Sequence, residues 1–313
     1  MRPAEVELTI IVPAYNVGKK IENALRSLAQ QRTKHTYEVL IIAGPSTDET
    51  RDVARDFAAK YPGFFVLDYP EKNVLGARML GIENARGRYI GFCDGDDAME
   101  DYAVDVMAST LAHTDADVVQ TGFYFVKAHR TKPTFFRRDK TYDRGEFYRA
   151  MLKDDYVRGY LWCKAFRREL FEDFPLVVPK ENLYREDTYF LFHACAKMNK
   201  AVTLKVPTYY YDKTGESGFS APTKKRVDDF LAVLGVERLL HESFGDEALL
   251  RFYRKMKIRR KAQLFFDLWL TRKAYDKGER SLRKKELKRY LKMLSSPEPL
   301  PVEGMPWEAL WKK

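Results

Sequence analysis

The chain has 313 residues, a net charge of +10, 45% hydrophobic residues and 14% aromatic residues. This composition excludes a disordered or low-complexity chain, because such chains lack the apolar residues that form a core. No apolar run reaches the roughly 18 residues that a membrane-spanning helix needs. Three widely spaced cysteines, Cys93, Cys163 and Cys195, argue against a disulfide framework or a cysteine metal site. We expect a cytoplasmic protein, since these cysteines suit a reducing compartment and the first residues do not resemble a secretion signal.

The N-terminal half alternates apolar strands with amphipathic helices. Strands are predicted at residues 6–12 (ending at Pro13), 37–42, 64–67 and 88–93. Helices are predicted at residues 19–31, 46–58 and 75–85, where apolar side chains recur at helical spacing. This alternation indicates an α/β fold with a central, mostly parallel sheet and helices on both faces. In such sheets ligands bind beyond the carboxyl ends of the strands.

Three aspartates follow the fourth predicted strand within four residues, namely Asp94, Asp96 and Asp97. Carboxylates this close raise one another's pKa unless a cation offsets their charge. Such oxygen-rich sites suit Mg²⁺ or Mn²⁺ shared with a substrate phosphate. A solvated turn with helix-capping aspartates is the alternative.

Four segments carry a resemblance to a known family. They are residues 10–16 (IIVPAYN), 46–48 (STD), 76–81 (GARMLG) and 87–97 (GRYIGFCDGDD). In this order and at these separations they resemble the catalytic core of family 2 glycosyltransferases, which are inverting enzymes of the GT-A fold. The resemblance continues more thinly to about residue 220, through residues 162–168 (WCKAFRR), 185–187 (RED) and 209–211 (YYY).

The resemblance implies a site for a nucleotide-sugar donor, with a UDP-sugar as the first candidate. It implies Mn²⁺ or Mg²⁺ as cofactor, held by Asp96 with Asp94 assisting. The donor site it implies consists of Pro13, Ala14, Tyr15, Asn16, Gly44, Arg78, Asp94, Gly95 and Asp96.

The resemblance also implies an acceptor site and a base. Asp187 is the expected catalytic base, which takes the proton of the acceptor hydroxyl; a capping or first-turn acid is the alternative. Glu186 and Trp162 are expected to bind the acceptor, although Trp162 could equally be a core residue. The acceptor would be a glycan or a lipid-linked molecule of cell-surface polysaccharide biosynthesis.

Two positions depart from the family pattern. Gly44 stands where the family places the acid that contacts the nucleobase, and Met79 stands where it places an asparagine. These departures support a second hypothesis, in which the chain is a degenerate GT-A-like protein that acts as a partner or scaffold in such a pathway.

Three regions are expected along the chain: a nucleotide-sugar-binding core at residues 1–130, an acceptor-binding part at 131–222 and a basic helical region at 223–313. Residues 224–313 carry 23 Lys and Arg against 13 Asp and Glu, a net charge of +10 that accounts for the whole excess. The basic region is expected either to lie on the anionic inner face of the plasma membrane or to form a solvated amphipathic bundle. No motif indicates nucleic-acid binding, and the resemblance implies a homodimer.

Overall fold

A computed structural model of the chain describes residues 5–127, 130–134, 138–153, 157, 159–173, 186–212, 247, 251 and 255. The chain divides into two compact units, residues 1–220 and 221–313. The second unit is described at three residues, Glu247, Arg251 and Lys255, each of which is helical. The other predictions for the basic C-terminal region therefore fall outside the described residues.

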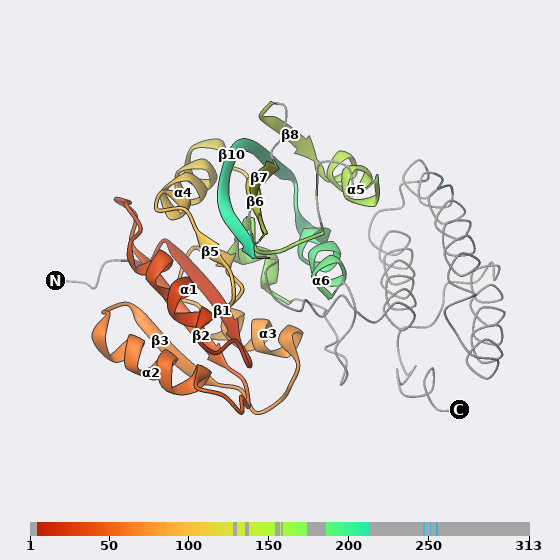
Figure 1. Ribbon diagram of the computed structural model, residues 1–313. Helices are drawn as coiled ribbons and strands as arrows, with labels where there is room; N and C mark the ends of the chain where they lie inside the picture. The colour runs from red at the N-terminus through yellow and green to blue at the C-terminus, as the bar shows by residue number, and fades with distance from the viewer. Residues whose placement is uncertain are drawn as a thin grey trace, which may run out of the picture. The chain divides into compact units, whose positions relative to one another are not determined.

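The first unit is a mixed α/β fold (Figure 1). Its strands are β1 (Leu8–Ala14), β2 (Tyr37–Ala43), β3 (Phe64–Asp68), β4 (Tyr89–Phe92), β5 (Ala98–Met99), β6 (Val118–Lys127), β7 (Arg130–Thr134), β8 (Lys140–Asp143), β9 (Lys164–Arg167) and β10 (Lys200–Asp212). Its helices are α1 (Lys20–Ala29), α2 (Thr50–Lys60), α3 (Val74–Asn84), α4 (Ala103–Thr114), α5 (Arg144–Lys153) and α6 (Glu186–Ala194), with 3₁₀ turns at Arg168–Phe171 and Cys195–Lys197.

Among the described residues the strands form one sheet in the order β3-β2-β1-β4-β9-β6-β10-β5. Strands β1 to β4 are mutually parallel, β9 runs antiparallel to both β4 and β6, and β10 is parallel to β6. Figure 1 shows the red and orange strands at one end of this sheet and the green strands at the other. The carboxyl ends of β1 to β4 therefore lie along one edge, where a ligand site is expected.

Side chains alternate between the two faces of β1, as the period of a strand requires. Ile10 and Val12 pack in a core with residues of α1, α2 and α4. Ile11 points to the opposite face, where a Cβ on Gly81 of α3 would lie 2.6 Å from its Cγ2. Gly81 thus lets α3 pack closely against the sheet. On the same face Phe92 of β4 meets Phe190 of α6, with ring centroids 5.6 Å apart.

The four strands and three helices predicted for the N-terminal half are confirmed, with shifts of one to four residues at most of their ends. Two of these shifts have a clear local cause. Strand β1 continues through Pro13 to Ala14. Its pairing with β4 stops at Ile11, so the missing N–H of Pro13 interrupts no pair with that strand. Helix α2 begins at Thr50, not at Ser46, because the Asp48 side chain accepts the Thr50 N–H at 3.1 Å.

Within the part of the chain that the structure describes, every helix is too short or too polar to cross a membrane. All three cysteines are buried free thiols.

Candidate functional site

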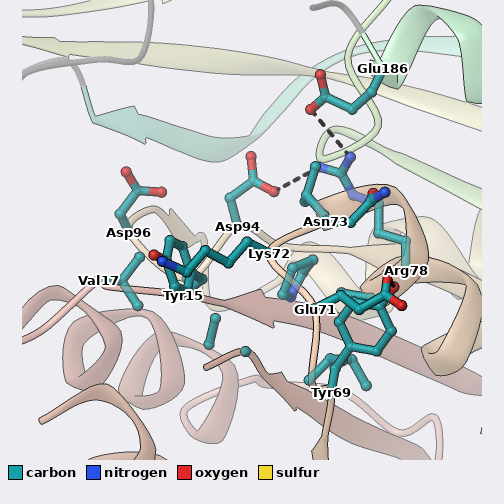
Figure 2. Close-up of a pocket in the computed structure, with 17 residues that line it drawn as sticks. Tyr15, Val17, Tyr69, Glu71, Lys72, Asn73, Arg78, Asp94, Asp96 and Glu186 are labelled. Carbon is teal, nitrogen blue, oxygen red and sulfur yellow. Dashed lines mark hydrogen bonds and ion pairs between the residues drawn. The ribbon is translucent and has the colours of Figure 1, made fainter. Parts of the chain in front are cut away.

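A pocket of about 250 Å³ lies at the carboxyl ends of the parallel strands (Figure 2). Its walls come from the segments that follow β1, β2, β3 and β4 and from the first turns of α3 and α6. The pocket brings together most of the residues predicted for donor binding, and Glu186 of the predicted acceptor site. The predicted residues that line it are Pro13, Ala14, Tyr15, Gly44, Arg78, Asp94, Gly95, Asp96 and Glu186. Asn16, Trp162 and Asp187 are not among its lining residues.

Asn16 joins two loops of the pocket rim. It has a φ of 48°, a left-handed conformation that asparagine tolerates better than most residues. Its Oδ1 accepts the Thr47 N–H at 2.9 Å, and its own N–H donates to Ser46 Oγ at 3.1 Å. The side chain therefore fixes the loop after β1 to the loop after β2, and its part in the site is to shape the rim.

Gly44 packs against Tyr15 at the end of β2. Its N–H donates to Ala14 O at 2.8 Å, and a Cβ at Gly44 would lie 3.2 Å from Tyr15 Cβ. Tyr15 is 39% exposed, and Lys72 Nζ lies 5.4 Å from the centre of its ring. At the position where the family pattern has an acid, the rim therefore has Gly44 packed against the ring of Tyr15.

The three aspartates after β4 do not converge. Asp97 is 4% exposed, and its two carboxylate oxygens accept the Tyr209 hydroxyl and the Asp212 N–H, both at 2.8 Å. Burial, together with the charges of Asp94 and Asp96, raises the pKa of Asp97 to about 9. Asp97 therefore anchors the acidic turn to β10 and does not line the pocket.

Asp94 and Asp96 line the pocket and have different partners. Asp96 is exposed at the pocket mouth; desolvation by its surroundings raises its pKa, and the charge of Lys20 opposes this shift. Burial raises the pKa of Asp94 to about 6, although Arg78 lowers it. The Asp94 N–H donates to the hydroxyl of Tyr209 at 3.0 Å, so β10 also holds this turn through its backbone.

Arg78 of α3 is the centre of a buried charge network. It is 2% exposed, and its guanidinium lies 2.6 Å from Asp187, 3.1 Å from Asp94 and 3.6 Å from Glu186. Figure 2 shows the contacts to Asp94 and Glu186 at the pocket wall. One cation thus joins α3, the acidic turn and the first turn of α6, and it offsets carboxylate charge that would otherwise be buried unpaired.

The two acids of α6 differ in exposure to the pocket. Glu186 lines the pocket, and burial and the neighbouring Asp187 raise its pKa to about 7, against the effect of Arg78. Asp187 is engaged by Arg78 and by the Leu161 N–H, which lies 3.4 Å from its Oδ2. Both acids occupy the first turn of the helix, where an acid is also stabilised by the helix dipole.

The structure favours the core interpretation of Trp162. This side chain is 2% exposed and stacks on Tyr209 and Tyr160, with ring centroids 4.6 and 4.7 Å apart. Because its indole is buried and packed against these rings, it has no exposed face for a sugar, and the structure does not support Trp162 as an acceptor-binding residue.

The segment after β3 contributes a wall whose residues were not among the predicted site residues. Tyr69, Glu71, Lys72 and Asn73 all line the pocket. Asn73 caps α3, with its Oδ1 accepting the N–H groups of the second and third helical residues at 3.0 and 3.2 Å. In the sequence, the one indication that these residues line the site is their position directly after a parallel strand.

The acidic turn has two carboxylates that could hold a cation. No group of three or more His, Cys, Asp or Glu side chains within the described ranges is arranged to hold a metal ion. Asp94 and Asp96, however, line one pocket, and Mg²⁺ is commonly held by one or two carboxylates together with substrate phosphates. The residues therefore fit a cation that a bound diphosphate helps to hold, and not one held by the protein alone.

The chain is similar to known glycosyltransferases. Residues 9–174 match the sequence profile described as Glycosyl transferase family 2. The chain is 28% identical over 228 residues to the uncharacterized glycosyltransferase EpsJ of Bacillus subtilis (strain 168), covering 72% of this chain and 66% of that protein. It is 24% identical over 257 residues to the poly(ribitol-phosphate) beta-N-acetylglucosaminyltransferase TarS of Staphylococcus aureus, covering 79% of this chain and 44% of TarS. The chain thus spans about two thirds or less of the length of these relatives.

Solved structures share the fold. The crystal structure of S. aureus TarS 1-349 in complex with UDP-GlcNAc has a TM-score of 0.72 at 20% identity, covering 92% of this chain and 80% of that chain. The mannosyltransferase PcManGT from Pyrobaculum calidifontis, in complex with GDP-Man and Mn²⁺, has a TM-score of 0.51 at 16% identity, covering 92% and 85%. At these identities the likeness concerns the fold, and it confirms the predicted GT-A architecture.

Proposed function

Because the chain belongs to glycosyl transferase family 2, we propose that it transfers a sugar from a nucleotide-sugar donor to a hydroxyl of an acceptor. The observation that carries the proposal is the pocket at the ends of β1 to β4, which holds Asp94, Asp96, Arg78 and Glu186 within one small volume. An anionic, metal-binding leaving group such as a diphosphate matches this combination of carboxylates and a guanidinium.

The proposed reaction is a single displacement with inversion at the anomeric carbon. The bond between the anomeric carbon and the diphosphate oxygen breaks, the acceptor oxygen forms the new bond on the opposite face, and the acceptor hydroxyl gives up its proton to a base. We assign the base to Asp187, which Arg78 and the Leu161 N–H hold at the start of α6. Glu186 is the competing candidate, since it lines the pocket and has a pKa of about 7, near the optimum for proton transfer at neutral pH.

The leaving group needs charge stabilisation. Asp96, with Asp94 beside it, would hold Mn²⁺ or Mg²⁺, which supplies Lewis-acid stabilisation of the departing phosphate. Arg78, at the pocket wall, adds positive charge close to the same place. Neither contribution requires a covalent enzyme intermediate, so no nucleophilic side chain is proposed.

The substrates are proposed at the level that the relatives support. UDP-sugars come first because TarS was solved with UDP-GlcNAc, and GDP-sugars follow because PcManGT was solved with GDP-Man. A glycan or lipid-linked acceptor of cell-surface polysaccharide biosynthesis is the proposed acceptor class. A cytoplasmic location, peripheral membrane association through residues 223–313 and a homodimer remain predictions from the sequence.

A nucleotide-sugar panel tests the proposal. Thermal unfolding of the full chain is measured with each nucleotide sugar and Mn²⁺, because a ligand that binds the folded state raises its apparent stability. Release of nucleoside diphosphate is then measured for each donor that binds. Stabilisation and slow hydrolysis of one donor are expected. Absence of binding and turnover with every donor and divalent ion, together with a co-purifying glycosyltransferase, would instead support the scaffold hypothesis.

A further inference from the structure

The sheet order gives the pocket two distinct ends. Because the strands run in the order β3-β2-β1-β4, the Asp94–Asp96 turn after β4 and the segment after β3 lie on opposite sides of the β1 loop. Three strand spacings of about 4.8 Å separate β4 from β3. If the diphosphate lies by the acidic turn, as the proposed function holds, the nucleoside extends across β1 and β2 toward β3.

The pocket has an aromatic ring on the loop after β1 and a carboxylate on the segment after β3. The ring is that of Tyr15, which is 39% exposed and has Lys72 Nζ 5.4 Å from its centre. Four acids line the pocket, and three of them, Asp94, Asp96 and Glu186, belong to the turn after β4 and to α6. Glu71 is the fourth, and it lies on the exposed segment after β3.

The neighbouring residues orient the Glu71 side chain. The Tyr69 hydroxyl donates to Glu71 Oε2 at 3.4 Å. A Cβ at Gly76 would lie 1.9 Å from that hydroxyl, so the first turn of α3 accommodates the tyrosine because residue 76 is glycine. Figure 2 shows Tyr69 and Glu71 side by side on this wall of the pocket.

We propose that Glu71 recognises the nucleobase of the donor. The Glu71 carboxylate accepts the imide-type N–H of the base, while the ring of the base stacks on Tyr15. The N–H group is N3–H in uracil and N1–H in guanine. Glu71 would thereby supply, from the segment after β3, the acceptor that Gly44 cannot supply from the end of β2. This inference rests on the proposed function and adds the residue that selects the nucleotide.

Methylated nucleotides test the proposal directly. Binding of UDP and of N3-methyl-UDP is measured by calorimetry with Mn²⁺, and the same pair is measured for GDP and N1-methyl-GDP. Wild-type protein is expected to bind one unmethylated nucleotide at least about tenfold more tightly than its methylated form, the usual effect of a hydrogen bond to a charged acceptor. In Glu71→Leu this ratio is expected to fall to near one. Glu83→Leu is the matched control, because Glu83 is exposed on α3 and does not line the pocket.

The outcomes separate this inference from the proposed function. Failure of wild-type protein to bind any nucleoside diphosphate would overturn the proposed function. Tight binding of UDP or GDP with the same methyl discrimination in wild type and Glu71→Leu would overturn the role of Glu71 and leave the function standing. Preferential binding of ADP or CDP, whose bases lack this N–H, would likewise overturn it. Circular dichroism of both variants checks that they are folded.

Discussion

Arg78 Nη1 lies 2.6 Å from Asp187 Oδ1, although the two residues are 109 positions apart in the chain. The same guanidinium contacts Asp94 at 3.1 Å, so the candidate base and the acidic turn share one buried cation. Asp187 and Asp94 therefore share the charge of Arg78, and variants at these positions are best compared with one another.

Replacement of Arg78 should damage both stability and activity. Arg78→Gln leaves partly buried carboxylates without their cation, which typically costs about 3–5 kcal/mol. We expect a loss of that size in the free energy of unfolding, measured by denaturant titration, and at least a hundredfold loss of transfer. Arg26→Gln is the control, since Arg26 makes an exposed ion pair with Glu22 four residues away, and its replacement should leave the free energy of unfolding nearly unchanged. Equal effects of the two substitutions would contradict a central role for Arg78.

The base assignment predicts a difference between kcat and donor binding. Asp187→Asn removes the proposed proton acceptor and keeps the shape of the side chain. Transfer should fall by about 10²–10⁴-fold, the usual contribution of general-base catalysis, while the Kd for the donor changes little. Glu186→Gln should retain most of the rate if its role is acceptor binding. A larger loss of kcat in Glu186→Gln than in Asp187→Asn would assign the base to Glu186.

The raised pKa of Glu186 predicts a pH-dependent effect on stability. In the folded protein this pKa is about 7, above its ordinary value of 4.5. Between these values the folded state keeps a proton that the unfolded state has released, so the contribution of Glu186 to stability falls as the pH rises toward 7. Glu186→Gln removes this dependence. Relative to wild type, the variant should therefore gain stability between pH 5 and 7.5, by at most about 3 kcal/mol at 1.36 kcal/mol per pKa unit. A difference that is constant across this range would contradict the shift.

The two neighbouring aspartates predict opposite results for metal-dependent donor binding. Asp96 faces the pocket, whereas Asp97 is bound by Tyr209 and by the Asp212 N–H. In Asp96→Asn the stabilisation of the protein by donor and Mn²⁺ should be lost, as measured by the shift in Tm. Asp97→Asn keeps an oxygen that can accept the Asp212 N–H, so it should retain this stabilisation, with at most a general change in Tm. Retained Mn²⁺-dependent binding in Asp96→Asn would argue against a cation at this place.

The basic C-terminal region predicts salt-dependent binding to anionic membranes. Flotation of the full chain with phosphatidylserine vesicles should decrease in Arg251→Glu/Lys255→Glu, because each basic residue near such a surface contributes about 1 kcal/mol. Vesicles of neutral lipid serve as the control. Equal flotation of wild type and variant with anionic vesicles would contradict this membrane contact.

The local pattern of apolar and polar residues was sufficient to predict much of the fold of this protein. Alternating apolar strands and amphipathic helices predicted the parallel half of the sheet, since strand and helix periods are properties of short segments. The position of Asp94 and Asp96 after a strand predicted that they would line a pocket, because parallel strands bring their carboxyl ends to one edge. The family resemblance predicted the GT-A fold, which the structural comparisons confirm.

The partners of individual side chains could be identified only from the tertiary structure. Nothing near Asp97 in the sequence indicates that Tyr209, 112 positions away, closes its carboxylate off from the pocket. Trp162 looked equally suited to the core and to a sugar, and stacking on Tyr160 and Tyr209 identified it as a core residue. The burial and pairing of a side chain depend on which distant segments pack together, and the assembled sheet determines this packing. The periods of strands and helices, by contrast, are already present in each short segment of the chain.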